Sequence, residues 1–139
     1  MKSGEKRDKV KTKNKKELGS WGEKKARKYL ENNNYKIVES NFQTRSGEVD
    51  LIAVQDKFIV FIEVKTRRSH SFGQPESSIN HRKKDKIRSL ANYYLLKHDY
   101  SDLQVRFDVI TIMIRKDRSN DSNYGNGTNF ELNHIENAF

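Results

Sequence analysis

Two apolar segments that carry ionisable residues constrain this chain most. The first covers residues 47–53 and includes Asp50, and the second covers residues 58–65 and includes Glu63 and Lys65. The second segment has apolar side chains at both odd and even positions, which is typical of a central strand covered on both faces. Because an unpaired carboxylate in such a strand costs several kcal/mol, these acids need a partner or a function.

The short link between the two strands predicts where their acids meet. If residues 56 and 57 form a two-residue turn, Asp50 lies opposite Glu63. Opposed residues have Cβ atoms roughly 4.5–5.5 Å apart, and Lys65 projects from the same face as Glu63 because side chains alternate. A three-residue turn would instead set Asp50 opposite Ile62 and send the carboxylates to opposite faces, unless a bulge restores the register.

This arrangement of charges predicts a metal site with hydrolytic chemistry. Two adjacent carboxylates repel each other, and hard oxygen ligands favour Mg²⁺ or Mn²⁺ as the cation that relieves the repulsion. The metal would polarise a phosphoryl oxygen and activate water, while Lys65 would orient that water or stabilise the transition state. Asp50, Glu63 and Lys65 therefore predict phosphodiester hydrolysis. The simpler alternative is that both acids are strand-end charges paired with Lys65.

The order of elements predicts the fold class. Apolar residues at helical spacing indicate a first helix that ends near Asn32, followed by strands over residues 35–39, 47–54 and 58–65. A second amphipathic helix then leads to a strand over residues 105–114. A crossover of that length allows this strand to pair parallel to the central one. We expect an α/β or α+β fold with a mixed β-sheet flanked by helices.

Composition divides the chain into one domain and a tail. Residues 1–16 contain eight Lys or Arg, two acids, one valine and no aromatic residue, which predicts a disordered basic tail. Residues 17–115 form the expected domain, residues 116–129 a polar loop, and residues 130–139 the last piece of the domain. No segment resembles a signal peptide or a membrane span. The absence of cysteine is consistent with the cytoplasm, where we expect the protein to act.

Basic residues gather around the predicted site and indicate a nucleic-acid partner. They end the second strand and begin the second helix, where phosphates are their natural ligands. A solvated helix face is the alternative. We expect DNA rather than RNA, with contacts from Lys65, Arg67, Arg68, Arg82, Lys83, Lys84 and Lys86.

The motifs resemble a known family. Asp50 followed by Glu63-Val64-Lys65 looks like the D…(D/E)-x-K signature of the restriction-endonuclease-like, PD-(D/E)XK, nuclease superfamily. Val49 stands where the proline of that signature often lies, and no Gln-x-x-x-Tyr of the RecB type follows. Further segments extend the resemblance to the bacterial YraN family over roughly residues 18–114, with a layout similar to archaeal Holliday junction resolvases. These segments are residues 19–23, 47–53, 61–67, 72–73 and 106–109.

The resemblance implies a role for each acid. Glu23, Asp50, Glu63 and Lys65 would be catalytic, and Asp50 and Glu63 would bind Mg²⁺ or Mn²⁺. Glu23 has an alternative role, because Ser20 and Glu23 also fit a capping box at a helix start. The implied function is a metal-dependent DNA nuclease, structure-selective for branched DNA, and a resolvase-like action would require a two-fold homodimer. The alternatives are a non-catalytic nucleic-acid-binding protein with this fold and an interaction protein whose acids are structural.

Overall fold

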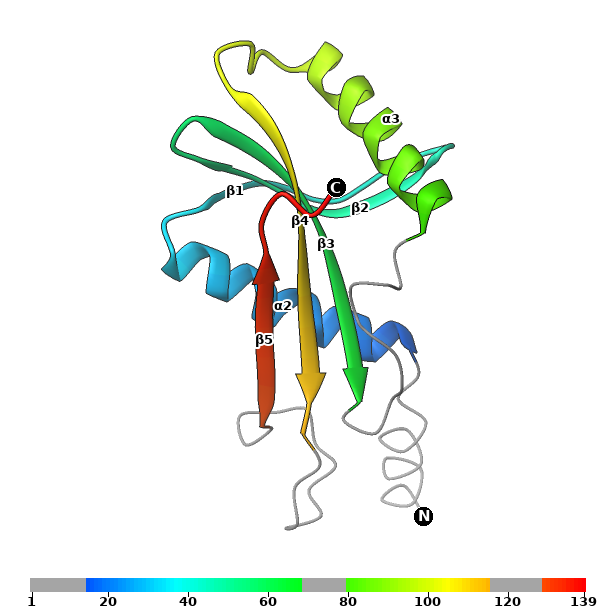
Figure 1. Ribbon diagram of the computed structural model, residues 1–139, viewed down its shortest axis with the longest axis vertical. Helices are drawn as coiled ribbons and strands as arrows, with labels where there is room; N and C mark the ends of the chain where they lie inside the picture. The colour runs from blue at the N-terminus through cyan, green and yellow to red at the C-terminus, as the bar shows by residue number, and fades with distance from the viewer. Residues whose placement is uncertain (1–14, 69–79, 116–128) are drawn as a thin grey trace, which may run out of the picture.

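The computed structural model describes residues 15–68, 80–115 and 129–139. Its elements follow the expected order, with two helices and five strands (Figure 1). They are α2 (Lys15–Asn32), β1 (Lys36–Thr44), β2 (Gly47–Gln55), β3 (Phe58–Arg68), α3 (His81–Lys97), β4 (Gln104–Ile114) and β5 (Phe130–Ile135). Most of the predicted basic tail and polar loop lies outside the described residues. Neither described helix is long and apolar enough to cross a membrane.

The five strands form one mixed sheet in the order β1-β2-β3-β4-β5. Strands β1, β2 and β3 form an antiparallel meander, as predicted. Strand β4 pairs parallel to β3 after the α3 crossover, which is also confirmed. Strand β5 pairs antiparallel to β4 at the far edge. The predicted α+β class with a mixed, helix-flanked sheet is therefore confirmed.

The β2–β3 hairpin has the predicted two-residue turn. Gln55 pairs with Phe58, and the regular register continues as far as Leu51 and Ile62. Asp56 in the turn has a φ of 51°, a left-handed conformation that aspartate tolerates better than most residues. Asp50 and Glu63 are the next positions beyond the last regular pair, so the three-residue turn is excluded.

The two helices cover opposite faces of the sheet (Figure 1). On one face, Ala26 and Leu30 of α2 pack against a cluster that includes Val60 and Ile62 of β3. On the other face, Ile87, Ala91 and Tyr94 of α3 pack against Val49, Ile52, Ile59 and Phe61. Strand β3 contributes alternate residues to both clusters, so the prediction of a central strand covered on both faces is confirmed.

Candidate functional site

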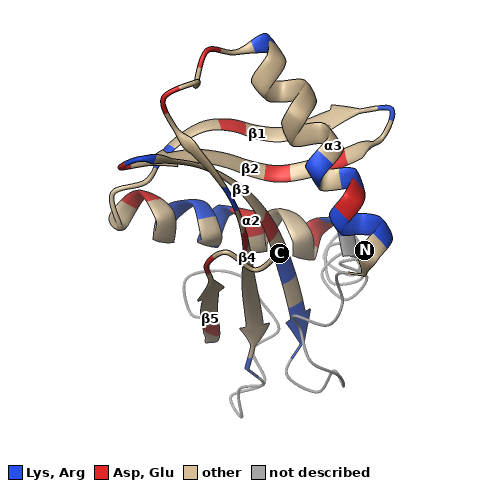
Figure 2. Ribbon diagram, turned by 45° about the horizontal axis from the view of Figure 1, so that its top comes forward, with Lys and Arg blue, Asp and Glu red and all other residues tan. Residues whose placement is uncertain are grey.

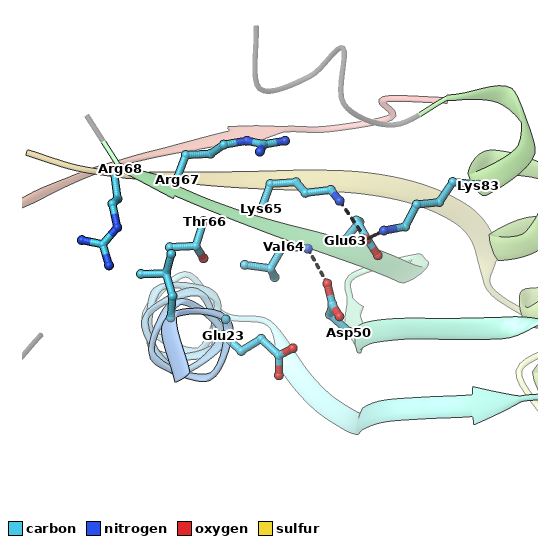
Figure 3. Close-up of a pocket in the computed structure, with 11 residues that line it drawn as sticks. Glu23, Asp50, Glu63, Val64, Lys65, Thr66, Arg67, Arg68 and Lys83 are labelled. Carbon is cyan, nitrogen blue, oxygen red and sulfur yellow. Dashed lines mark hydrogen bonds and ion pairs between the residues drawn. The ribbon is translucent and has the colours of Figure 1, made fainter. Parts of the chain in front are cut away.

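The predicted catalytic residues lie together in one cleft. Glu23 comes from α2, Asp50 from β2, and Glu63 and Lys65 from β3 (Figure 3). The cleft has a volume of about 500 Å³, and Lys83 of α3 also contributes to its wall. Its other lining residues are Leu18, Gly19, Val64, Thr66, Arg67 and Arg68. Four elements that are separated along the chain therefore meet at the acids that the sequence singled out.

Asp50 reaches the cleft because strands β1 and β2 change face at its position. Val49 packs against α3, whereas Leu51, two residues later, packs on the α2 face. In a regular strand these two side chains would share a face. Asn41 of β1 lies beside this point and has a φ of 52°. The irregularity at Asn41 and Asp50 is not visible in the sequence pattern, because it depends on a left-handed residue that is not glycine.

The side chain of Asp50 makes the next contact between β2 and β3, just beyond their last regular backbone pair. Its Oδ2 accepts a hydrogen bond of 2.7 Å from the backbone N–H of Val64 in β3 (Figure 3). This contact fixes the orientation of the carboxyl group and holds it beside the segment that carries Glu63 and Lys65. The predicted register therefore holds between β2 and β3. At the position of Asp50, however, the two strands are joined by a side-chain hydrogen bond and not by a backbone pair.

The cleft raises the pKa values of two carboxyl groups. Burial, followed by the nearby charge of Glu63, raises the pKa of Asp50 to about 8, although the Val64 hydrogen bond opposes the shift. Burial also raises the pKa of Glu23, whose hydrogen bonds with Asn41 and Asp50 oppose that shift. Burial and the neighbouring carboxylates disfavour the ionised forms of these acids, and a bound cation would stabilise those ionised forms.

Glu63 is buried, with its side chain 5% exposed, and is held by two lysines. Its Oε2 lies 2.5 Å from Nζ of Lys83 and 3.8 Å from Nζ of Lys65. Burial and then the neighbouring Lys83 lower the pKa of Lys65. Burial opposes the charged form of Lys83 as well, but its hydrogen bond to Glu63 outweighs this and raises the Lys83 pKa. The two lysines therefore differ, with Lys83 the firmly charged partner of Glu63.

The donor set of the cleft fits a hard divalent cation. The second oxygen of Glu63, Oε1, is buried without a hydrogen-bond partner among the described residues. Asp50 and Glu63 offer carboxylate oxygens, and the lining includes no sulfur or imidazole group. Across residues 15–68, 80–115 and 129–139, no group of three or more His, Cys, Asp or Glu is arranged to hold a metal by itself. Mg²⁺ typically binds one or two carboxylates together with water and substrate phosphates, and Asp50 and Glu63 could supply the carboxylates.

The capping-box alternative for Glu23 is wrong. Helix α2 already includes Lys15, so Ser20 and Glu23 lie in its interior rather than at its N-terminus. Glu23 instead points across the cleft toward Asp50 (Figure 3). The sequence pattern was misleading because the good helix formers at residues 15–18 extend the helix past Gly19, which alone does not end it.

The predicted nucleic-acid contacts divide into three groups. Lys65, Arg67, Arg68 and Lys83 line the cleft, and Arg82 and Lys86 line neighbouring hollows. Lys84 lies elsewhere, with its Nζ 5.8 Å from the centre of the Phe139 ring. Asn41 and Thr66 are site residues that the sequence analysis missed, since no charge or motif marks them. The contact between Lys83 and Glu63 was also missed, because it depends on where α3 docks.

Sequence comparisons place most of the chain in one family. The profile of the uncharacterised protein family UPF0102 matches residues 22–112. A UPF0102 protein of Thermodesulfovibrio yellowstonii is 47% identical over 125 residues, which cover 88% of this chain and 96% of the relative. One from Syntrophomonas wolfei is 42% identical over 88% of this chain and 97% of the relative. One from Caldanaerobacter subterraneus is 41% identical over 91% and 97%, respectively. The resemblance to the YraN family is thus confirmed, and the chain belongs to UPF0102.

Proposed function

We propose that this protein is a metal-dependent nuclease that hydrolyses phosphodiester bonds in DNA, with a preference for branched DNA. The observation that carries the proposal is the meeting of Asp50, Glu63 and Lys65 in one cleft, where the Glu63 carboxylate is buried and one of its oxygens has no hydrogen-bond partner among the described residues. A buried carboxylate with a free oxygen is costly in a purely structural role. It is what a metal ligand requires.

In this proposal Asp50 and Glu63 hold Mg²⁺ or Mn²⁺. The bound cation supplies Lewis-acid polarisation of a phosphoryl oxygen and lowers the pKa of water at the site. Val64 keeps Asp50 oriented through its backbone N–H, at 2.7 Å. Glu23 hydrogen-bonds with Asp50 and Asn41, so it positions the ligand.

Lys65 is the cation best suited to the reacting phosphate. Its pKa is lowered by burial and by Lys83, so its ammonium group is more acidic than that of an exposed lysine. It can therefore donate a strong hydrogen bond to a phosphoryl oxygen, or a proton to the leaving oxygen. Arg67 and Arg68 follow on the same strand and line the same cleft, where they would bind flanking phosphates. Paired cuts in a four-way junction would need two such sites, which we propose a homodimer supplies.

One contact favours a second candidate function, a non-catalytic nucleic-acid-binding protein. Nζ of Lys83 already lies 2.5 Å from Oε2 of Glu63 and neutralises its charge. A metal ion bound at the same oxygen would have to displace Lys83. If Lys83 stays bound to Glu63, the Glu63 charge is neutralised and the cleft is a basic surface. Phosphate contacts alone would then account for its charge.

Cleavage assays separate the two functions. We would incubate the full chain with labelled linear duplex, single-stranded and four-way-junction DNA in Mg²⁺, Mn²⁺ or EDTA. Asp50→Asn keeps an acceptor for the Val64 N–H but removes the negative charge, so we expect cleavage to fall on the order of 10²-fold or more. Asp56→Asn, in the exposed turn of the same hairpin, is the matched control and should cut like the wild type.

Three results bear on the proposal. Metal-dependent cutting that is lost in Asp50→Asn and kept in Asp56→Asn would support the nuclease. Cutting that persists in Asp50→Asn would point to a contaminating enzyme and contradict it. DNA binding without cutting by the wild type would favour the second candidate.

A further inference from the structure

The cleft is the first of three hollows that follow one another along α3. The second hollow, of about 310 Å³, lies between the start of β2 and the start of α3 and shares Lys83 with the cleft. The third, of about 580 Å³, lies between the β1–β2 turn and α3 and shares Arg82 and Lys86 with the second. Because neighbouring hollows share lining residues, they lie next to one another from the end of β3 to the β1–β2 turn, and we call this row the groove.

Basic side chains dominate the part of this groove beyond the cleft. Arg45, Arg82, Lys83 and Lys86 line it, against the acids Glu48 and Asp85. Asp85 is itself engaged by Arg88, with 3.5 Å between Asp85 Oδ1 and Arg88 Nη1. Figure 2 shows basic residues gathered at the beginning of α3. The surplus of positive charge therefore lies on the α3 wall, whereas Arg45 and Glu48 carry opposite charges on the strand wall.

The two arginines in this part of the groove differ from four other arginines of the described core. Arg27, Arg88, Arg106 and Arg115 each form an ion pair with an acid of the chain. Arg45 and Arg82 have no such pair within residues 15–68, 80–115 and 129–139, and neither does Lys86. All three side chains are exposed. Cations that are gathered in a groove and left without internal acids are available to an anionic ligand.

Local backbone structure holds the two walls together. Gly47 begins β2 with a φ of +151°, and a Cβ at this position would lie 3.8 Å from Cδ of Lys86. The backbone N–H of Ser46 donates to Oγ1 of Thr44 at 3.0 Å, which fixes the turn that carries Arg45. On the opposite wall, Asn80 caps α3 by accepting a hydrogen bond of 2.9 Å from the N–H of Lys83. The groove is thus built by a fixed turn and a capped helix start.

We propose that Arg45, Arg82 and Lys86 form an extended binding site for the sugar-phosphate backbone of one nucleic-acid strand. The strand leaves the cleft past Lys83 and runs along α3 to the β1–β2 turn. This inference rests on the proposed function, because it takes the cleft as the place where a phosphodiester is held. Arg45, which no sequence motif marks, is the distal end of the site.

Binding of short and long oligonucleotides tests this path. We would measure fluorescence anisotropy of labelled single-stranded DNA of roughly 5 and 25 nucleotides with the full chain in EDTA, over a range of salt concentrations. Arg45→Gln and Lys86→Gln should each weaken binding of the long oligonucleotide roughly three- to tenfold and lower the salt slope by about 0.7–1. Binding of the short one should change little. Arg27→Gln, on exposed α2 and already paired with Glu31, is the control and should match the wild type.

The outcomes separate this proposal from the nuclease function. If Arg45→Gln and Lys86→Gln bind the long oligonucleotide as tightly as the wild type does, the proposed binding site in the groove is wrong, whether or not the protein cuts DNA. Arg45-dependent binding by a protein that cuts no DNA would support the groove and overturn the nuclease. If the wild type binds neither oligonucleotide, the groove proposal falls, and the cleavage assays with branched and duplex DNA decide the nuclease separately. Circular dichroism melting curves would show that each variant is folded, as expected for exposed side chains.

Discussion

Asp50 illustrates how function and stability oppose each other at a single residue. Its carboxyl group is held in place by one backbone hydrogen bond, yet burial and Glu63 raise its pKa to about 8. Near neutral pH the folded protein therefore binds a proton there that the unfolded chain releases. A divalent cation would replace this proton, since metal binding requires the deprotonated carboxylate.

This raised pKa predicts that Asp50→Asn stabilises the protein at high pH. Since the folded-state pKa is above the unfolded value of 3.8, the contribution of Asp50 is fully present below about pH 4 and is lost as the pH rises through about 8. The free energy of unfolding of Asp50→Asn should exceed that of the wild type by roughly 1–3 kcal/mol at pH 9 and match it near pH 4. Urea denaturation across this pH range measures the difference.

Mg²⁺ and a second variant provide the controls for this experiment. Added Mg²⁺ should recover the stability of the wild type at pH 8–9 and leave Asp50→Asn unchanged, because a ligand stabilises only the state that binds it. Asp56→Asn should follow the wild type at every pH. Parallel curves for the wild type and Asp50→Asn from pH 4 to 9 would contradict the assigned pKa.

At the scale of elements, the approach of α2 to β3 depends on Gly22. A Cβ at Gly22 would lie 1.8 Å from Oγ1 and 3.0 Å from Cβ of Thr66, so the helix crosses the strand where it has no side chain. The crossing lies one residue before Glu23 and one residue after Lys65. The docking of α2 therefore also sets how far Glu23 reaches into the cleft.

Gly22→Ala should destabilise the protein by about 1–3 kcal/mol, because α2 must move away from β3. Thr66→Ala removes the nearest atom, so we expect it to recover part of this loss in the double variant. Gly19→Ala is the matched control, since a Cβ there meets nothing within 4 Å, and alanine in a helix should be neutral or stabilise by up to about 1 kcal/mol. Thermal denaturation of the four variants measures this. Equal effects of the two glycine substitutions would show that the close approach is not needed.

The elements also show what the sequence could and could not predict. The β2–β3 register was predictable from the two-residue turn, and the parallel pairing of β4 from the crossover helix. Both features depend on the length of the segment that joins the two strands. The face change at Asn41 and the partner of Lys83 were not predictable in this way. The first depends on an uncommon backbone conformation, and the second on tertiary docking of α3.

At the scale of the whole molecule, a buried polar network around Asp108 links β4 to β5 and to Asn137, which follows β5. Asp108 of β4 is fully buried and accepts hydrogen bonds of 2.9 Å from both Nε and Nη2 of Arg106. It also lies 2.7 Å from Nε2 of His134 in β5 and accepts a 3.0 Å bond from the N–H of Asn137. Burial alone would raise the pKa of Asp108, but His134 and Arg106 outweigh it and lower the pKa.

Asp108→Asn should therefore cost about 3–5 kcal/mol, because it leaves the buried Arg106 without its counter-charge. A lowered folded-state pKa gives stability that is present above the unfolded value and lost as the pH falls through the folded one. The wild type should thus lose stability in acid more steeply than Asp108→Asn, as measured by urea denaturation at pH 7 and pH 3. Glu131→Gln, which breaks the exposed pair with Arg115, should cost less than about 1 kcal/mol. Similar costs for the two variants would refute a structural role for the network.

The irregular course of β1 has a consequence for the protein's behaviour at high concentration. Strand β1 lies at one edge of the described sheet, where a straight strand offers free N–H and C=O groups to other chains. Its register shifts between Ile37 and Glu39, and Asn41 is left-handed four residues after Ile37. These two breaks leave no long regular edge for another chain to extend. The distortion that brings Asp50 into the cleft thus also guards the protein against edge-to-edge aggregation.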